Sequence, residues 1–404
     1  YTLSLHDALP ILVILKTAPR SWYFSDYNRT LPACNDTSSA WFVTEWKASN
    51  NYIYFPATGT NNDYTIKYVE IDAFGGNEVG SPHWIHNAGN NHQIYQHIQA
   101  GKLYRISAFG GSFRRLYFYN TQSRKDIYRV TQWGSTDWNS FYWAFSQCSN
   151  LDVTATDEPY MEDVTDMSGM FHECKNLKNT NGSINTWDVS NVTNMQHMFY
   201  GDSLFNQPLN NWNTEKVQYM GSMFYNAASF NQPLSWNTSK VTDMSNMFWG
   251  AKAFNSAINF TNTEKVQGMS SMFYGAKAFN QPLSFNTSSV TNMSNMFYNA
   301  VSFNSPLNFT NTSKVQSMNG MFYNDSAFNQ PVNFNTSEVT EMGNMFANAA
   351  SFNQPVNFTN TSKVRSMSGM FSGAKVFNQP LYFNILSVQD IITKIGRASC
   401  RERV

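Results

Sequence analysis

The residue types that most often do chemistry are thinly spread along this chain of 404 residues. Four histidines fall close together in its first quarter, and His83-Trp-Ile-His86 has a spacing at which two imidazoles can hold a metal ion. No cysteine or acidic residue is arranged with them, and Gly89-Asn-Asn91 has the composition of a turn. We therefore interpret all four as ordinary loop histidines: His83, His86, His92 and His97.

Acidic residues gather in only one place, at Asp157, Glu158, Glu162, Asp163 and Asp166. Carboxylate oxygens are the ligands that calcium prefers, but a solvated loop between two domains explains the same cluster, and we favour the loop. The polar residues of the repeats are mainly Asn, Ser and Thr with few carboxylates, and they show no grouping of nucleophile, base and orienting acid. The sequence therefore predicts no enzymatic activity, no metal and no cofactor.

The methionines are a second candidate for metal chemistry, because thioethers bind soft metal ions. Eighteen of the 19 lie in a Val-x-x-Met-x-x-Met-Phe frame, among valine and phenylalanine and without Cys or His at ligand spacing. The 3-4 spacing of this frame predicts a short helical turn with one buried face. We interpret these residues as core, with Met244, Met247, Phe248, Met269, Met272 and Phe273 as examples.

This frame recurs from Val164 to Phe371, and its phenylalanines settle to alternating separations of 25 and 24 residues. A period in this range is typical of stacked turns, that is, of a solenoid. Near the end of each repeat apolar side chains lie two apart, as in Leu283-Ser-Phe285, which predicts a strand with one buried face. We expect a mixed β/α repeat with one strand and one short helical turn per 24–25 residues, the strands pairing in a parallel sheet.

An asparagine directly follows an aromatic residue in every full repeat. We expect these side chains to stack as an amide ladder and to satisfy backbone groups in the bend between helix and strand, because buried backbone groups must be paired. The column consists of Asn206, Asn231, Asn255, Asn280, Asn304, Asn329, Asn353 and Asn378.

Two further columns are candidate binding surfaces. If Leu283 and Phe285 point inward, Ser284 points outward, and its column is Asn210, Ser235, Asn259, Ser284, Asn308, Asn333 and Asn357. The residue after each core phenylalanine is aromatic in six repeats, before Ala347 and Ser372. Such rings can stack on a sugar or anchor a protein partner, or they merely cover the rim of the core, which we favour. They are Tyr200, Tyr225, Trp249, Tyr274, Tyr298 and Tyr323.

Residues 41–135 differ from the repeats. Short aromatic and β-branched runs, such as Tyr64-Thr-Ile-Lys-Tyr-Val69, alternate with Gly- and Asn-rich turns and predict a small β-sandwich. Residues 12–40 are expected to be a disordered segment, and residues 136–394 a truncated solenoid.

The ends of the chain, residues 1–11 and 395–404, resemble a translated sequencing adapter, and we interpret both as artefacts. The repeat frame breaks at Ile391, where it requires methionine, so we expect an interrupted last turn and a natural protein that continues.

Charge and hydropathy exclude other partners. Acidic and basic residues are equal at 27 each, and no basic face is apparent, so nucleic acid is not expected. No run approaches the ~18 apolar residues that cross a bilayer. Cys148 and Cys174 occupy the same slot in consecutive repeats. A disulfide between them remains open, although two small buried thiols are favoured.

The string Asn-Thr-Ser-Lys-Val-Thr-Asp-Met-Ser-Asn-Met-Phe, followed by Gly-Ala and Phe-Asn-Gln-Pro-Leu, resembles the repeat of BspA-like leucine-rich surface proteins, of the type found in mycoplasma lipoproteins. This resemblance covers residues 140–392. Phe42-Val-Thr-Glu-Trp46 and Gln132-Trp-Gly134 resemble the PKD-like module of the same proteins. Where that module usually carries Trp-Gly-Asp-Gly-Ser, this chain has Ile71-Asp-Ala-Phe-Gly-Gly76.

The resemblance implies a leucine-rich-repeat-like solenoid and a non-enzymatic role in adhesion or in protein or glycan interaction. It also implies an extracellular or cell-surface location, with a protein or glycan on a host or neighbouring cell as partner. One alternative is an ice- or glycan-lattice binder that uses the Asn-Thr-Ser arrays as a regular hydroxyl lattice. A third is an enzyme in the N-terminal module.

Overall fold

The computed structural model describes residues 39–381, and from Ala40 onward these belong to one compact unit. Several predictions concern residues outside this range. They are the adapter-like ends at 1–11 and 395–404, nearly all of the segment 12–40, and the interrupted turn at Ile391.

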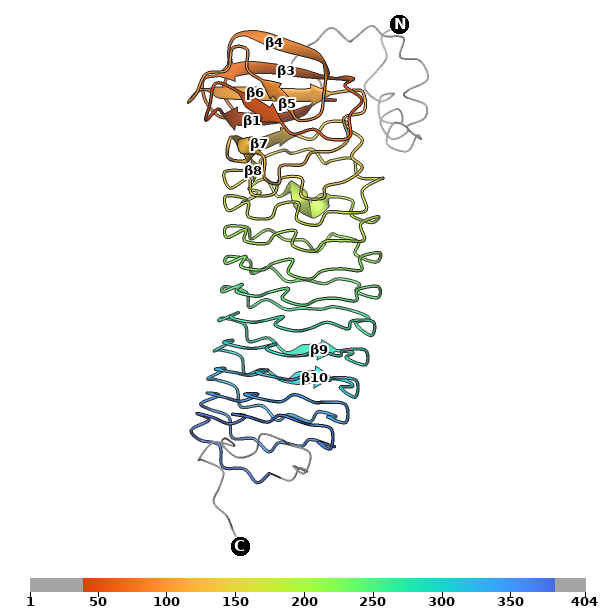
Figure 1. Ribbon diagram of the computed structural model, residues 1–404, viewed down its shortest axis with the longest axis vertical. Coiled ribbons are helices and arrows are strands. Elements are labelled where there is room, and N and C mark those ends of the chain that lie inside the picture. Colours follow the sequence, from red (N-terminus) through yellow and green to blue (C-terminus); the bar gives the residue numbers. More distant parts are fainter. Residues whose placement is uncertain (1–38, 382–404) are drawn as a thin grey trace, which may run out of the picture. The chain divides into compact units, whose positions relative to one another are not determined.

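Six strands form the larger sheet, in the order β4-β3-β6-β1-β7-β8 (Figure 1). Most residues of its central strands are buried, including Phe42 and Trp46 in β1. A small antiparallel pair, β2 and β5, contributes Phe55, whose ring centroid lies 6.3 Å from that of Trp46. The bounds are β1 Phe42–Lys47, β2 Ile53–Phe55, β3 Tyr64–Ile71, β4 Glu78–Ala88, β5 His92–Ile94, β6 Leu103–Phe109, β7 Ile127–Gln132 and β8 Asp152–Val153.

The sheet and the repeats share one hydrophobic core, which runs without a break from Phe42 to Phe377. Strand β8 pairs in parallel with β7 and leads into the repeats. The ring of Trp133 lies 5.7 Å from Phe42 in the sheet and 5.2 Å from Trp187 in the repeats, measured between centroids. The sheet therefore covers the first end of the stacked core, which every repeat array must close.

The repeats stack as coils in the order of the chain (Figure 1). Single parallel bridges join each coil to the next, for example at Tyr219, Asp243 and Gly268. The two regular strands of the described repeats, β9 Leu283–Phe285 and β10 Leu307–Phe309, pair in parallel, with Leu283 opposite Leu307. Two 3₁₀ segments complete the secondary structure, η3 Gln122–Lys125 and η4 Ser183–Thr186.

The predicted mixed β/α, leucine-rich-repeat-like solenoid is wrong. Residues 39–381 contain no α-helix, and the repeats consist of turns and isolated bridges with one two-stranded sheet. The Met-Phe stretch is not helical because only every second N–H stays within its own coil. The Met247 N–H donates to Met244 O at 3.2 Å, but the Phe248 N–H donates to Met272 O of the next coil at 2.8 Å. An α-helix would direct every N–H to the carbonyl four residues back.

Two left-handed residues in each coil produce this alternation. Asn246 has φ 58° and Gly250 has φ 65°. Left-handed backbone is incompatible with a right-handed helix and is adopted routinely only by Gly and, less easily, Asn. The 3-4 apolar spacing survives because consecutive tight turns also return Met244, Met247 and Phe248 to the inside. The residues equivalent to Asn246 in the other coils are Ser222, Ser271, Asn295, Gly320, Asn344 and Gly369. The residues equivalent to Gly250 are Asn226, Gly275, Asn299, Asn324, Asn348 and Gly373.

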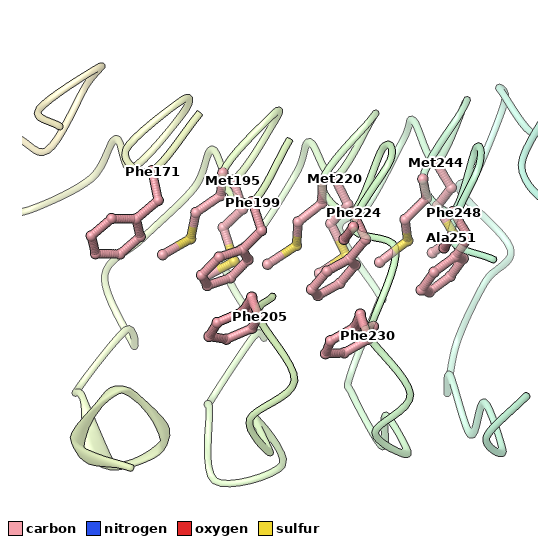
Figure 2. Packing of buried hydrophobic residues seen from close by; sticks show 14 of the residues in the cluster. Phe171, Met195, Phe199, Phe205, Met220, Phe224, Phe230, Met244, Phe248 and Ala251 are labelled. Atoms are coloured by element: carbon pink, nitrogen blue, oxygen red, sulfur yellow. The ribbon is translucent and has the colours of Figure 1, made fainter. Parts of the chain in front are cut away.

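The predicted core residues lie in continuous stacks along the coils. Figure 2 shows Met195, Met220 and Met244 repeating beside the stacked phenylalanines. The Phe248 ring lies 5.6 Å from Phe224 in the preceding coil and 5.5 Å from Phe273 in the next, with interplanar angles of 5° and 8°. Of the residues predicted as structural core, Asn255 and Asn280 are exposed, contrary to that prediction, whereas the apolar ones are fully buried: Met244, Met247, Phe248, Met269, Met272 and Phe273.

Replacing Phe273 by Ala should lower the free energy of unfolding by about 3–5 kcal/mol, because it empties a fully buried ring site between two stacked neighbours. Urea unfolding followed by circular dichroism measures the change, and the loss should spread to adjacent coils. The exposed Ser284→Ala serves as control and should stay within about 0.5 kcal/mol. A loss below about 1 kcal/mol for Phe273→Ala would contradict its place in the core.

Substitutions of Asn295 test the left-handed backbone, because the sign of the change in unfolding free energy differs between a left-handed turn and a helix. At φ 57°, Asn295→Ala should cost about 1 kcal/mol of unfolding free energy, whereas in a helix the same change would stabilise by about 0.5 kcal/mol. Asn295→Gly should be nearly neutral, since Gly320 and Gly369 occupy this position in other coils. A stabilising Asn295→Ala would restore the helical interpretation.

Candidate functional site

The histidines do not converge on a metal site, and the interpretation of all four as loop residues is wrong. His83 and His86 lie in β4, and His92 lies in β5. His83 and His97 stack face to face, with centroids 3.9 Å apart and an interplanar angle of 6°. This arrangement turns their faces, not their lone pairs, toward each other. Burial, and secondarily the neighbouring His97, lowers the pKa of His83. Across residues 39–381, no three His, Cys, Asp or Glu side chains are grouped to hold a metal ion.

Two carboxylates of the acidic cluster accept hydrogen bonds from backbone N–H groups. The carboxylate of Asp157 accepts hydrogen bonds from the N–H groups of Trp133 at 3.0 Å and Gly134 at 2.8 Å. Asp166 likewise accepts from the Ser168 N–H at 2.8 Å. Both carboxylates therefore hold turns at the junction between the sheet and the first coils.

The asparagine ladder bonds each coil to the next. The Oδ1 atom of Asn255 accepts the backbone N–H of Asn280, and Asn280 does the same for Asn304, both at 2.8 Å. Most of these residues are exposed, Asn329 and Asn353 are half-buried, and the side-chain oxygen of each from Asn206 to Asn353 accepts a hydrogen bond from the following coil. The ladder runs through Asn206, Asn231, Asn255, Asn280, Asn304, Asn329, Asn353 and Asn378.

A buried threonine ladder was missed by sequence reasoning. The Thr238 hydroxyl donates to Thr261 O of the next coil at 2.7 Å, and Thr263 donates to Asn286 O at 3.0 Å. The sequence contained a sign of this ladder. The Thr in the middle of each Asn-Thr-Ser or Asn-Thr-Glu triplet is the same in seven successive repeats, whereas an exposed residue would vary. These hydroxyls lie inside the stack and do not form an exposed lattice. The buried threonines are Thr214, Thr238, Thr263, Thr287, Thr312, Thr336 and Thr361.

The outward residues of the strand-like segments form what we call the polar column: Asn210, Ser235, Asn259, Ser284, Asn308, Asn333 and Asn357. All seven are exposed, whereas Leu283 and Phe285 beside Ser284 are buried. Neighbours in the column contact one another in places. The Ser235 N–H donates to Asn210 Oδ1 at 2.9 Å, and Asn357 Nδ2 donates to Asn333 Oδ1 at 3.0 Å.

The aromatic residues after the core phenylalanines form a second column, here named the aromatic ladder. Successive rings stack with centroids 3.8–5.3 Å apart and interplanar angles of 3–18°. Each inner ring therefore has both faces covered, which leaves edges and hydroxyls for a partner and not the faces that would stack on a sugar. The six are half-buried: Tyr200, Tyr225, Trp249, Tyr274, Tyr298 and Tyr323.

The ladder continues further toward the sheet than the sequence indicated. The His172 ring stacks on Tyr200 at 4.6 Å, and Trp143 lies 4.9 Å from His172, measured between centroids. His172 directly follows Phe171, so the repeat frame itself contained the signal for this ring.

The repeats agree with a known family. The family model described as "Mycoplasma protein of unknown function, DUF285" matches residues 139–235, 234–315 and 306–401. The chain belongs to this family. No curated protein and no solved structure matches the chain.

The DUF285 matches begin at residue 139 and leave residues 41–135 unmatched, so the PKD-like resemblance of those residues stays a prediction. Within the described range of this DUF285 chain, no helix is long and apolar enough to cross a membrane.

The third residue after the core phenylalanine is alanine in many of the DUF285 repeats, but in some it is a buried polar residue. Cys148 and Cys174 occupy this position as free, buried thiols, with Cys174 Sγ donating to Phe145 O at 3.0 Å. Burial raises the pKa of both thiols. The same position holds Asp202 and Asp325, which sequence reasoning overlooked although each interrupts a column of alanines.

Asp325 is fully buried, and neither carboxyl oxygen has a hydrogen-bond partner among residues 39–381. Burial raises its pKa well above the usual range, because the charged form is desolvated. The folded protein therefore keeps this carboxyl protonated to a higher pH than the unfolded chain does. Stability is therefore undiminished by this ionisation at acid pH, where both states are protonated, and falls as pH rises from the unfolded pKa toward the folded pKa.

Asp325→Ala should raise the free energy of unfolding at neutral pH by about 1–3 kcal/mol, because it removes an unpartnered buried polar group. Alanine already occupies this position at Ala276, Ala300 and Ala349. The advantage should shrink as pH falls toward about 3.9, where the unfolded carboxyl also takes up a proton. Urea titrations across this range measure it, and Asp325→Asn should remove the pH dependence. A pH-independent difference between Asp325→Ala and the parent would refute the buried neutral carboxyl.

Proposed function

We propose that this chain is a non-enzymatic binding scaffold that acts at the cell surface or in secreted form, in adhesion or in protein or glycan interaction. The polar column carries the proposal. Seven exposed Asn or Ser side chains repeat along one face, and all except Asn210 stand between buried or half-buried apolar residues. The similarity of the repeats to BspA-like surface proteins supports the location.

The physical advantage of the polar column is preorganisation. Its backbone is held on both sides by parallel bridges, such as Leu234 to Ile258 and Leu283 to Leu307. Fixed amide and hydroxyl groups lose little conformational freedom when a partner binds, so more of the interaction energy appears as affinity. Both donate and accept hydrogen bonds, which suits the hydroxyls of a glycan or the backbone of a protein on a host or neighbouring cell.

The edges of the aromatic ladder are a second, smaller candidate surface, because their hydroxyls lie beside half-buried rings. The alternative of an ice- or glycan-lattice binder is less well supported. It needs exposed threonine arrays, and the threonine ladder is buried and hydrogen-bonded between coils, as at Thr238.

The test is binding by the purified chain to a glycan array and to intact cells, with and without a disrupted polar column. The triple variant Asn259→Arg, Ser284→Arg and Asn308→Arg places bulk and charge on three neighbouring coils, and we expect at least a tenfold loss, about 1.4 kcal/mol. These positions are exposed, so the melting temperature should change little.

A matched control has the same charge change on another exposed column, in the triple variant Gln218→Arg, Gln267→Arg and Gln316→Arg. It should bind as the parent does. Equal loss in both variants would indicate a general charge effect, and intact binding in the first would remove the polar column from the proposal.

A further inference from the structure

Three consecutive members of the aromatic ladder, Tyr274, Tyr298 and Tyr323, form what we call the tyrosine triad. Their ring centroids lie 4.5 and 4.4 Å apart, with interplanar angles of 3° and 4°. Tyr200 and Tyr225 form a separate tyrosine pair at 4.3 Å and 3°. Trp249 stands between the two groups, so Tyr225 and Tyr274 are not neighbours.

The rings of the triad are parallel neighbours in successive coils. Burial raises the pKa of Tyr298, and the neighbouring phenols of Tyr274 and Tyr323 raise it further. The rings are half-buried, so part of each remains open to solvent. The coil geometry holds neighbouring rings parallel and 4.3–4.5 Å apart between centroids, whereas two free tyrosines come this close only by collision.

From this geometry we propose that the tyrosine triad and the tyrosine pair are sites of oxidative modification, at which neighbouring coils become joined by dityrosine bonds. The oxidant is hydrogen peroxide acting through a haem peroxidase. Each phenol loses one electron and its hydroxyl proton, and the two radicals form a carbon–carbon bond between positions ortho to the oxygens. The ortho hydrogens then move to the oxygens. Two tyrosines and one hydrogen peroxide thus give one dityrosine and two waters.

The consequence is a covalent staple between coils that otherwise touch only through non-covalent contacts. Joining Tyr298 to Tyr323 closes a loop of one repeat, and such a cross-link stabilises by restricting the unfolded chain. The two cysteines among residues 39–381 are buried free thiols and supply no such staple in this structure.

The experiment treats the dilute full-length chain with peroxidase and hydrogen peroxide, then maps cross-linked peptides by mass spectrometry after proteolysis. We expect each bond to remove two hydrogen atoms and to connect Tyr200 with Tyr225, Tyr274 with Tyr298, or Tyr298 with Tyr323. Dityrosine fluorescence should rise together with the melting temperature.

Tyr298→Phe keeps the ring but removes the reactive phenol, so both triad products should vanish while the Tyr200–Tyr225 product persists as an internal control. Tyr219→Phe is the matched control, because Tyr219 is 42% exposed and forms no ring contact within residues 39–381. It should leave the pattern unchanged. Products dominated by Tyr219 or by links between molecules, or an identical pattern from urea-unfolded protein, would overturn the proposal.

Discussion

The structure depends on one constraint, the redirection of every second backbone N–H of the Met-Phe stretch from its own coil to the next. Left-handed residues such as Asn246 and Gly250 make this possible. The redirected bonds, such as Phe248 N–H to Met272 O, hold each coil on its neighbour. Without them the stretch would satisfy its hydrogen bonds locally and could not form a stack.

When coils stack in this way, equivalent residues of successive repeats lie above one another in columns. Each column makes its own kind of contact between coils. Phenylalanine columns fill the core with parallel rings about one coil apart, as Phe248 does between Phe224 and Phe273. The asparagine and threonine ladders pair backbone groups that the turns leave unsatisfied. Asp325 shows the reverse, because its buried carboxyl finds no hydrogen-bond partner among residues 39–381.

The same repetition connects the core to function. Inward residues at Leu283 and Phe285 hold Ser284 outward, so an outward column is as regular as the core behind it. Regularity also limits what a column can do. In the aromatic ladder each inner ring covers its neighbour, which favours contact through edges and reaction between adjacent phenols over stacking on a ligand.

The sequence by itself determined the period, the core residues and the outward direction of Ser284, because these follow from which side chains avoid water at a fixed spacing. It did not determine how the Met-Phe stretch folds, since a 3-4 apolar spacing fits both a helix and consecutive tight turns. Asn and Gly at most of the left-handed positions were a hint, although Ser222 and Ser271 occupy two of them. Stacking also decided that Thr238 is buried, that ladder faces are covered and that Trp133 joins sheet and repeats in one core. These depend on contacts between residues distant in the chain, which local spacing does not encode.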